Sequence, residues 1–531
     1  MKSILLTLGS LVSLCLFIFG VWCLEYKRTT SKAWNEPTEY HADTYIELGY
    51  IRAVAQGDCT WLGVKEVHRL NWPGTASWQN FPMYEKVPIF ILGQIAKRSN
   101  LAFAANVGVV AARVTAAIGF WLAAFGILRC SRLMAWAGAA AFSLLYYYDW
   151  RGMSHVFLCF TWTIPLFVAA SWQKPKLWVL LLISFAVGLS NPYWVLGALI
   201  LTIICQHGIG PRLVMLAGLA SGFILSNLAT ILWSHKMALL RTYAENERFA
   251  LKPLELLLPP PGGLFSDISA RYPANVLSFL QGEMFASYLG IAGIIALGLL
   301  LLDCFRQRKA LLPFAQVCAL VISGSIGGLT CLLALFGLPL FRAANRLSEF
   351  VAAICLLYLA RRLSNLPWSA VAKLIAAEVV IGTACLESFT FPRPHLAGPE
   401  QQKYHEDIQL GHDLDKACGG KSLYSVPPMY FPDCVIWPRI EPYDHLRPWM
   451  FTTNVSFSFG QATNKLSRVD QQTFDELNAG RVDVSRVKKE GYWGMILMRK
   501  MSLDNMDGVL KTMSPLAVSP DFIVVRLADE K

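Results

Sequence analysis

The chain of 531 residues is 55% hydrophobic and only 16% charged, and its formal net charge is +11. Soluble globular domains carry about 25% charged residues, so this composition excludes an ordinary soluble protein and predicts a polytopic membrane protein. In such a protein a positive excess is typical of cytoplasmic loops and of contact with anionic lipid, and it does not indicate a nucleic-acid partner.

About eleven apolar runs are predicted to be transmembrane helices. The first covers residues 3–24. It is long enough to cross a bilayer and no small-residue cleavage motif follows it, so we expect an uncleaved helix instead of a signal peptide. The other runs lie at residues 101–128, 133–148, 155–172, 177–190, 192–206, 211–233, 285–303, 311–333, 346–361 and 367–387.

Basic clusters in the short loops set the predicted orientation. Lys2 precedes the first run, and the clusters at residues 129–132, 174–176, 306–309 and 361–362 fall at alternate helix ends. Lysine and arginine favour the cytoplasmic side. We therefore expect the chain in a bacterial inner membrane with a cytoplasmic N-terminus, and with residues 25–100, 234–284 and 388–531 in the periplasm.

The C-terminal part, residues 388–531, is predicted to be a small α/β domain that follows a membrane domain of residues 1–387. The segments "KSLYSV", "GYWGMILMRK" and "DFIVVRL" have the composition of strands, and "QQTFDELNAG" that of a helix stopped by glycine. Within "YDHLRPWM" one interpretation is a loop fixed by a buried pair of Arg447 with Asp444. Cys418 and Cys434 could form a disulfide if this part is exported, which their spacing does not decide.

The first external loop contains an acidic cluster, "EYHADTYIELGY". Asp43 and Glu47 are four residues apart and share one face of a predicted amphipathic helix at the membrane surface. Three interpretations stay open. The acids form a solvated helix face, or Asp43 is a general base, or the pair holds a divalent metal ion.

The rest of that loop, "LNWPGTASWQNFPMYEKVP", is rich in aromatic and amide side chains. Such side chains suit sugar recognition, in which rings stack on sugars and amides bond hydroxyls, and they suit the membrane interface equally well. The candidate residues for binding the acceptor or a sugar are His41, Trp72, Trp78 and Tyr84.

Arginines gather in the later external segments. Arg248 and Arg271 lie in the second large loop, and Arg342 and Arg346 lie four apart at the outer start of a membrane helix. Guanidinium groups bind phosphate through two hydrogen bonds. These four residues either snorkel to the interface or bind a lipid phosphate where the lipid headgroup sits.

An uncleaved first helix, an acid in an amphipathic first-loop helix, cationic external loops and a C-terminal external domain resemble the C-type (GT-C) glycosyltransferases. "FRAANRLSEF", "PPMYFPD" and "EPYDHLRPWMFTTNVSFSFGQATN" resemble a bacterial subgroup, and the layout is similar to that of pilin-modifying glycosyltransferases. One departure is that many relatives have two adjacent first-loop acids, whereas Asp43 is single and Glu47 follows one turn later.

The resemblance implies a polyprenyl-phosphate sugar donor, membrane lipid around the helices and an extracytoplasmic acceptor, which is a protein such as pilin, a lipid or a polysaccharide. Asp43 would be the catalytic base with Glu47 beside it, and the arginines would hold the departing phosphate. No cofactor is certain, and a divalent metal is compatible. The alternatives are a lipid-linked sugar flippase or other transporter, and a non-catalytic membrane assembly protein.

Overall fold

The computed structural model describes residues 2–60, 63–64, 66–79, 85–233, 241–306, 310–391, 393, 398–432, 440–441, 443–463, 465–478, 482–500 and 515–527. The contacts divide the chain into two compact units. The helical unit is made of Met1–Trp34, Val107–Ser226 and Arg241–Pro394, and the sheet-containing unit is made of Asn35–Asn106, Asn227–Leu240 and His395–Lys531. The first external loop therefore belongs with the C-terminal segment, and the domain division at residue 387 stays a prediction.

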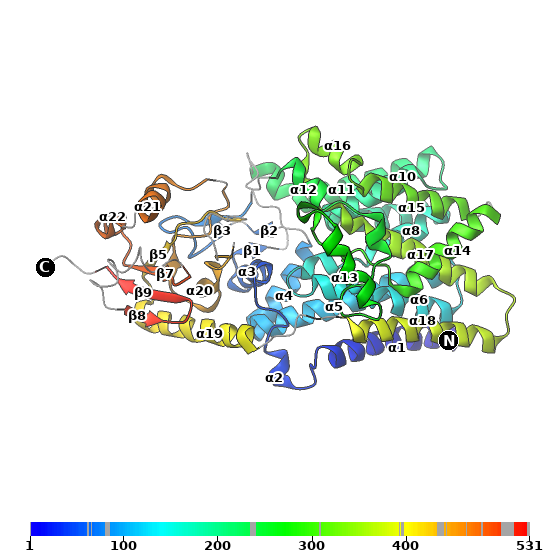
Figure 1. The fold of residues 1–531 in the computed structure, drawn as a ribbon, viewed down its shortest axis with the longest axis horizontal. Coiled ribbons are helices and arrows are strands. Elements are labelled where there is room, and N and C mark those ends of the chain that lie inside the picture. The colour runs from blue at the N-terminus through cyan, green and yellow to red at the C-terminus, as the bar shows by residue number, and fades with distance from the viewer. Residues whose placement is uncertain are drawn as a thin grey trace. The chain divides into compact units, whose positions relative to one another are not determined.

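The helical unit contains no described strand (Figure 1). Helices α5 and α11 cross its boundaries, and most of each belongs to it. Its elements are α1 Lys2–Glu25, α2 Ser31–Trp34, α5 Leu101–Trp121, η1 Leu122–Ile127, α6 Arg132–Ser143, α7 Tyr146–Arg151, η2 Val156–Cys159, α8 Thr163–Trp172, α9 Leu177–Leu189, α10 Pro192–Ile203, α11 Ile209–Trp233, α12 Tyr243–Arg248, η3 Pro253–Leu256, α13 Ser266–Asn275, η4 Ser278–Leu280, α14 Gly290–Arg306, α15 Leu311–Gly324, α16 Leu329–Leu335, η6 Pro339–Phe341, η7 Ala344–Leu347, α17 Ser348–Asn365 and α18 Ala370–Thr390.

Each predicted apolar run contains at least one of these helices. Among the described helices, four are long and apolar enough to cross a membrane: Ile4–Glu25, Leu101–Ile127, Ile209–Leu228 and Leu311–Leu335. Shorter apolar helices occupy Val156–Trp172, Leu177–Leu189 and Pro192–Ile203. The number of crossings, about eleven, stays a prediction.

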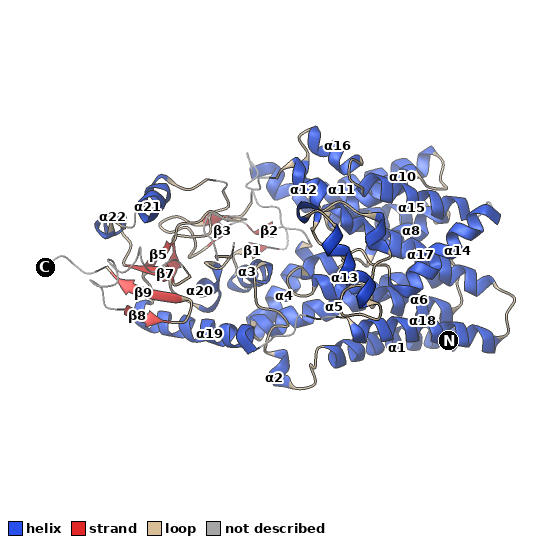
Figure 2. Ribbon diagram, in the orientation of Figure 1, coloured by secondary structure: helices blue, strands red, loops and turns tan. Residues whose placement is uncertain are grey.

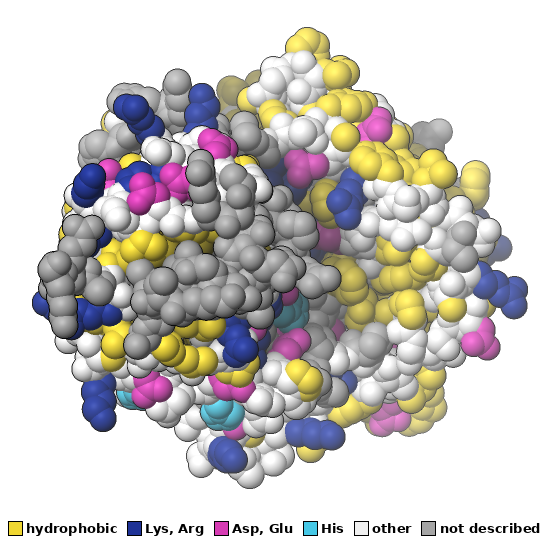
Figure 3. Space-filling view, turned by 60° about the vertical axis from the view of Figure 1, so that its left-hand side comes forward, with side chains coloured by type: hydrophobic (Ala, Val, Ile, Leu, Met, Phe, Trp, Pro, Cys, Tyr) yellow, Lys and Arg dark blue, Asp and Glu magenta, His cyan; other side chains and the backbone are white. Residues whose placement is uncertain are grey.

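Large apolar side chains are exposed on the surface of the helical unit, where hydrophobic side chains gather in Figure 3. On α18, Val371, Ile375 and Val379 are four residues apart and more than half exposed, at 66%, 55% and 56%. Four-residue spacing puts them on one helix face. Exposing such an apolar face to water is unfavourable, whereas contact with lipid tails is favourable.

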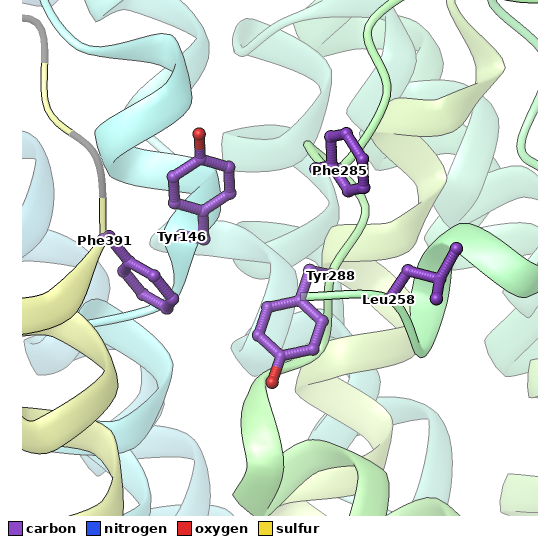
Figure 4. Packing of buried hydrophobic residues seen from close by; sticks show 5 residues of the cluster. All are labelled: Tyr146, Leu258, Phe285, Tyr288 and Phe391. Atoms are coloured by element: carbon purple, nitrogen blue, oxygen red, sulfur yellow. The ribbon is translucent and has the colours of Figure 1, made fainter. Parts of the chain in front are cut away.

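Small residues let α9 and α11 approach closely. A Cβ at Gly222 would lie 2.3 Å from the carbonyl oxygen of Phe185, and a Cβ at Gly188 would lie 2.4 Å from that of Leu219. Membrane helices associate through such small-residue contacts because lipid supplies no hydrophobic drive between them. Elsewhere in the unit, Tyr146, Leu258, Phe285, Tyr288 and Phe391 form a buried cluster that joins loops to helices (Figure 4).

The sheet-containing unit holds all of the described strands (Figure 2). Its helices are α3 Asp43–Gln56, α4 Lys86–Arg98, α19 Gly398–Cys418, α20 Leu446–Phe451, α21 Arg468–Asn478 and α22 Val484–Lys489. Its strands are β1 Cys59–Thr60, β2 Gly63–Val64, β3 Glu66–Val67, β4 Ala76–Ser77, β5 Ser422–Val426, β6 Ser456–Phe457, β7 Gly494–Met498, β8 Pro515–Val518 and β9 Phe522–Arg526. The three segments predicted as strands are β5, β7 and β9, and the predicted helix is α21.

The main sheet has the strand order β6-β5-β7-β9-β8. Strands β6, β5 and β7 are parallel, with Leu423 opposite both Phe457 and Gly494, whereas β9 is antiparallel to β7 and β8. The first loop extends the sheet: Phe457 N donates to Arg69 O at 2.7 Å, and Trp72 N donates to Phe457 O at 3.0 Å. This long-range pairing explains why the first loop and the C-terminal segment form one unit.

Candidate active site

Helix α3 carries the acidic pair of the first loop. It begins at Asp43, and the predicted apolar positions Tyr45, Leu48, Ile51 and Val54 are all buried, so the predicted helix is confirmed, whereas its place at the membrane surface stays a prediction. A carboxylate in the first turn is favourable because the N-terminus of a helix carries partial positive charge. The turn before the helix is fixed from the C-terminal segment, since the Ala42 amide donates to a carboxylate oxygen of Glu441 at 2.9 Å.

Glu47 lies one turn after Asp43 and differs from it in environment. Its Oε2 is buried and has no hydrogen-bond partner among the described residues. Burial, and then the negative charge of Asp43, raise the pKa of Glu47 well above its usual value. The two acids therefore differ in environment: Asp43 lies in the first turn of the helix, and Glu47 has a buried carboxyl oxygen whose surroundings favour its neutral form.

The part of the chain that the structure describes contains no group of three or more His, Cys, Asp and Glu side chains placed to hold one metal ion. Asp43 and Glu47 are two oxygen ligands on one helix face, and hard divalent cations take six or more. A metal bound here would complete its coordination with water or substrate oxygens, so the divalent ion stays a proposal.

The four candidate sugar-binding residues have different surroundings. The side chain of His41 is 40% exposed, with Nε2 3.9 Å from Glu39. Trp72 is half-buried and lies against the ring of Tyr492, with 4.8 Å between the centroids. Trp78 is 1% exposed and packs on Phe431, so it is a packing residue in this structure. Tyr84 lies outside the described residues.

A buried charge network supports the segment that leads into α3. The guanidinium of Arg447 donates from Nε and Nη2 to the two carboxylate oxygens of Asp407, at 2.7 and 2.8 Å. It also donates to Asp444 at 3.2 Å, so the predicted pair of Arg447 and Asp444 is confirmed. Asp407 in turn accepts from the hydroxyl of Tyr40 at 2.6 Å. The "YDHLRPWM" motif thus fixes the entry to the helix that carries Asp43.

In the helical unit, two of the four predicted phosphate-binding arginines are already partly paired. Arg342 donates to Glu245 and lies over the ring of Phe249. The guanidinium of Arg346 lies 4.4 Å from the ring centroid of Tyr193, and its Nη2 is 4.0 Å from Glu283. The other two predicted arginines, Arg248 and Arg271, are exposed.

Arg151, at the end of α7, joins this set. It is 1% exposed, and its Nη2 donates to Glu283 at 2.5 Å. Its Nε and Nη1, and the Nε of Arg346, are buried and have no hydrogen-bond partner among the described residues. Burial alone would raise the pKa of Glu283, but Arg151 and then Arg346 hold it well below its usual value. Buried N–H donors without acceptors are costly, so an anionic acceptor or a water molecule would stabilise them.

Sequence reasoning missed Arg151. It follows "YYYDW" in the short connection between the apolar runs at residues 133–148 and 155–172, and the alternation of the predicted helices puts this connection on the external side. Asn345, next to Arg346, donates to the same oxygen of Glu283 at 2.9 Å. Glu283 therefore joins Arg151 and Arg346, and the three residues come from three distant segments of the chain.

A second buried cluster of charged side chains has as many positive as negative members. Arg113 is fully buried, with Nη1 2.9 Å from Glu25 and Nη2 2.5 Å from Asp149. Arg393 lies 2.9 Å from Glu25 and 3.1 Å from Asp149. Two positive and two negative side chains neutralise one another, so Arg113 is held within a structural network.

No protein-family model and no curated protein matches the sequence. Solved structures match in fold. ArnT from Cupriavidus metallidurans, bound to undecaprenyl phosphate, has a TM-score of 0.53 and 12% identity over 98% of both chains. The arabinofuranosyltransferase AftD from mycobacteria has a TM-score of 0.52 and 12% identity over 98% of this chain and 40% of its own.

The chain has the GT-C fold. The resemblance predicted from the sequence is therefore confirmed at the level of the fold. The GT-C fold and the apolar helices make the chain a multi-pass membrane protein. The chain spans nearly the whole length of ArnT but only about two fifths of AftD. The orientation and the choice of membrane stay predictions.

Proposed function

We propose that this protein is a glycosyltransferase that moves a sugar from a polyprenyl-phosphate carrier to an extracytoplasmic acceptor. The observation that carries the proposal is the pair of buried Arg151 and half-buried Arg346, whose buried N–H groups without partners among the described residues offer an anion site in a chain with the GT-C fold. The ArnT structure with undecaprenyl phosphate supports a lipid phosphate as the anion.

The carrier phosphate is bound by arginines of the helical unit. Arg346 and Arg151 supply buried donors, and Arg342 adds a guanidinium that Glu245 holds in place. Arg248 and Arg271, which are exposed, attract the anionic headgroup of the membrane-bound carrier. Fixed positive charge stabilises the phosphate as it leaves, and it acts more strongly where water is excluded.

Asp43 is the general base of the proposed reaction. It takes the proton of an acceptor hydroxyl as the hydroxyl oxygen attacks the anomeric carbon. The bond between that carbon and the carrier phosphate oxygen breaks, and its electron pair leaves with the phosphate. One displacement inverts the anomeric centre. Glu47 orients the acceptor by donating a hydrogen bond when it is protonated. If it is ionised, Glu47 and Asp43 would instead hold a divalent ion that polarises the acceptor hydroxyl.

The acceptor is a protein such as pilin, a lipid or a polysaccharide, and His41 and Trp72 are proposed to contact it or the transferred sugar. The reaction takes place at the periplasmic face of the inner membrane, where a lipid-linked donor is available.

The test is transfer of a labelled sugar from polyprenyl phosphate by the full-length protein in vesicles that contain membrane extract as acceptor. We expect Asp43→Asn to lower the rate by roughly 10²–10⁴-fold, because the substitution keeps the shape and removes the base. Asp413→Asn, an exposed carboxylate on α19 in the same unit, is the matched control. Wild-type transfer by Asp43→Asn at equal protein level would remove Asp43 from the mechanism.

A further inference from the structure

A polar crevice lies at the carboxyl ends of two parallel strands in the sheet-containing unit. The chain leaves β5 through Met429 and Tyr430, and it leaves β6 through Ser458 to Thr463. Between these segments and the start of α21 is a cavity of about 360 Å³, which is within the range of small-ligand sites. Ligands of open sheets with parallel strands bind outside the carboxyl ends of the strands, so the position itself favours a binding site.

The polar groups of the crevice are fixed before any ligand arrives. The Gln461 Oε1 accepts from the Ser77 amide at 3.0 Å and from the Asn71 side-chain amide at 3.3 Å. Asp470 accepts from the hydroxyls of Tyr424 and Ser467, each at 2.7 Å. These bonds hold the side chains that line the cavity, and a prearranged site loses less entropy on binding.

The same geometry leaves hydrogen-bonding capacity directed at a ligand. Because Gln461 uses its oxygen internally, its Nε2 is a donor with no partner among the described residues. The Nζ of Lys465 and the Oδ1 of Asn71 also have no hydrogen-bond partner among the described residues, and both residues line the cavity. The crevice thus presents an acceptor and several donors within one small space.

This mixture matches a neutral polyhydroxylated ligand better than the alternatives. Sugar hydroxyls both donate and accept, as do the lining amides and hydroxyls. Lys465 and Asp470 balance one another in charge, which gives no preference for an anion. A peptide added as a strand would need the free edge of β6, but Arg69 and Trp72 already hydrogen-bond to Phe457 there.

We propose that this crevice binds a neutral carbohydrate portion of the acceptor. The proposal rests on the proposed glycosyltransferase function and specifies its acceptor as a glycan or a glycan-bearing molecule. Since Asn71 belongs to the first loop, acceptor binding in the crevice and the α3 helix with Asp43 are parts of one unit.

The test measures binding of short neutral oligosaccharides of glucose, galactose, mannose and N-acetylglucosamine to the full-length protein in nanodiscs, by saturation-transfer NMR without donor. Gln461→Glu keeps the oxygen that accepts from Ser77 and Asn71 and replaces the ligand-facing nitrogen. We expect it to weaken binding about tenfold. Lys465→Trp, at an exposed position on the rim, fills the cavity and should abolish binding.

Gln472→Glu, at an exposed position on α21 outside the crevice, is the matched control and should bind as the wild type does. The inference is overturned if no neutral oligosaccharide binds, if Gln461→Glu and Lys465→Trp both bind normally, or if only unglycosylated peptides or anionic glycans compete for the site.

The experiments distinguish failure of the crevice proposal from failure of the proposed glycosyltransferase function. Oligosaccharide binding with no transfer from any polyprenyl-phosphate sugar would support the crevice and contradict the enzyme. Sugar transfer with an unchanged acceptor KM in Gln461→Glu would support the enzyme and contradict the crevice.

Discussion

At the scale of single residues, the acidic pair on α3 owes its asymmetry to burial. Asp43 is at the first turn of the helix, where the helix dipole favours its charge, whereas Glu47 places a carboxyl oxygen in a buried position without a partner. Charging both would put like charges one turn apart. Burial and the neighbouring Asp43 both raise the pKa of Glu47 and so favour its neutral form.

The first prediction follows from the raised pKa of Glu47. Below its unfolded pKa of about 4.3, Glu47 is protonated in both states and has no pH-dependent effect on stability. As pH rises above that value the unfolded state loses the proton and the folded state keeps it, so stability is lost progressively until the pH passes the folded pKa. Glu47→Gln removes this loss.

We therefore expect the thermal unfolding midpoint of Glu47→Gln to exceed that of the wild type by an amount that grows from pH 4 to neutral pH. A difference in midpoint that is constant over this range would show that Glu47 is not held protonated in the fold. Gln substitution of Glu490, an exposed glutamate directly after α22, is the control.

The second prediction concerns Arg346, which the sequence indicated as a phosphate-binding residue, and Arg151, which it did not. Replacing Arg346 with Gln should raise the donor KM about 10- to 100-fold, because a charge-assisted hydrogen bond is lost. Arg151→Lys keeps the positive charge beside Glu283 but loses the guanidinium fork. We therefore expect it to retain only part of the wild-type donor use. Arg306→Gln, at an exposed position on α14, is the control.

A KM for the donor equal to that of the wild type in both variants, at normal membrane insertion, would leave these arginines as structural partners of Glu283. Expression and thermal stability are measured alongside, so that loss of the fold is separated from loss of binding.

At the scale of elements, local patterns predicted α3, α21, β5, β7 and β9, since periodicity and β-branched content act within a few residues. The pairing of Arg69–Trp72 with β6 could not be read from the sequence, because its partners are almost four hundred residues apart and each is only a few residues long. For the same reason the sequence gives no sign that Trp78, a candidate for sugar binding, is buried. Its surroundings, Phe431 and Trp449, come from the far end of the chain.

The third prediction tests the element that carries Asp43. Arg447 is 1% exposed and bonds both Asp407 and Asp444. Removing one partner of a buried ion pair leaves an uncompensated charge and costs roughly 3–5 kcal/mol. We expect Arg447→Met to lower the unfolding midpoint strongly and to expose the C-terminal segment to protease. Arg468→Met, an exposed arginine on α21, should change neither.

At the scale of the whole molecule, the polar machinery is divided between the two units. The proposed base Asp43, the buried Arg447 network and the crevice belong to the sheet-containing unit, whereas the arginines proposed to bind phosphate belong to the helical unit. The proposed reaction requires that all of these residues lie outside the cytoplasm, because a lipid-linked donor and an exported acceptor meet there.

The fourth prediction is this orientation. The basic clusters at residues 129–132, 174–176 and 361–362 predict cytoplasmic loops, and they place residues 25–100 and 388–531 outside. A periplasmic reporter fused after Lys531 should be active and a cytoplasmic reporter silent, and a cytoplasmic reporter fused after Lys176 should be active. The opposite result would place Asp43 on the cytoplasmic side, where soluble nucleotide sugars and not a translocated lipid carrier supply donors. It would contradict the proposed reaction while leaving the fold unchanged.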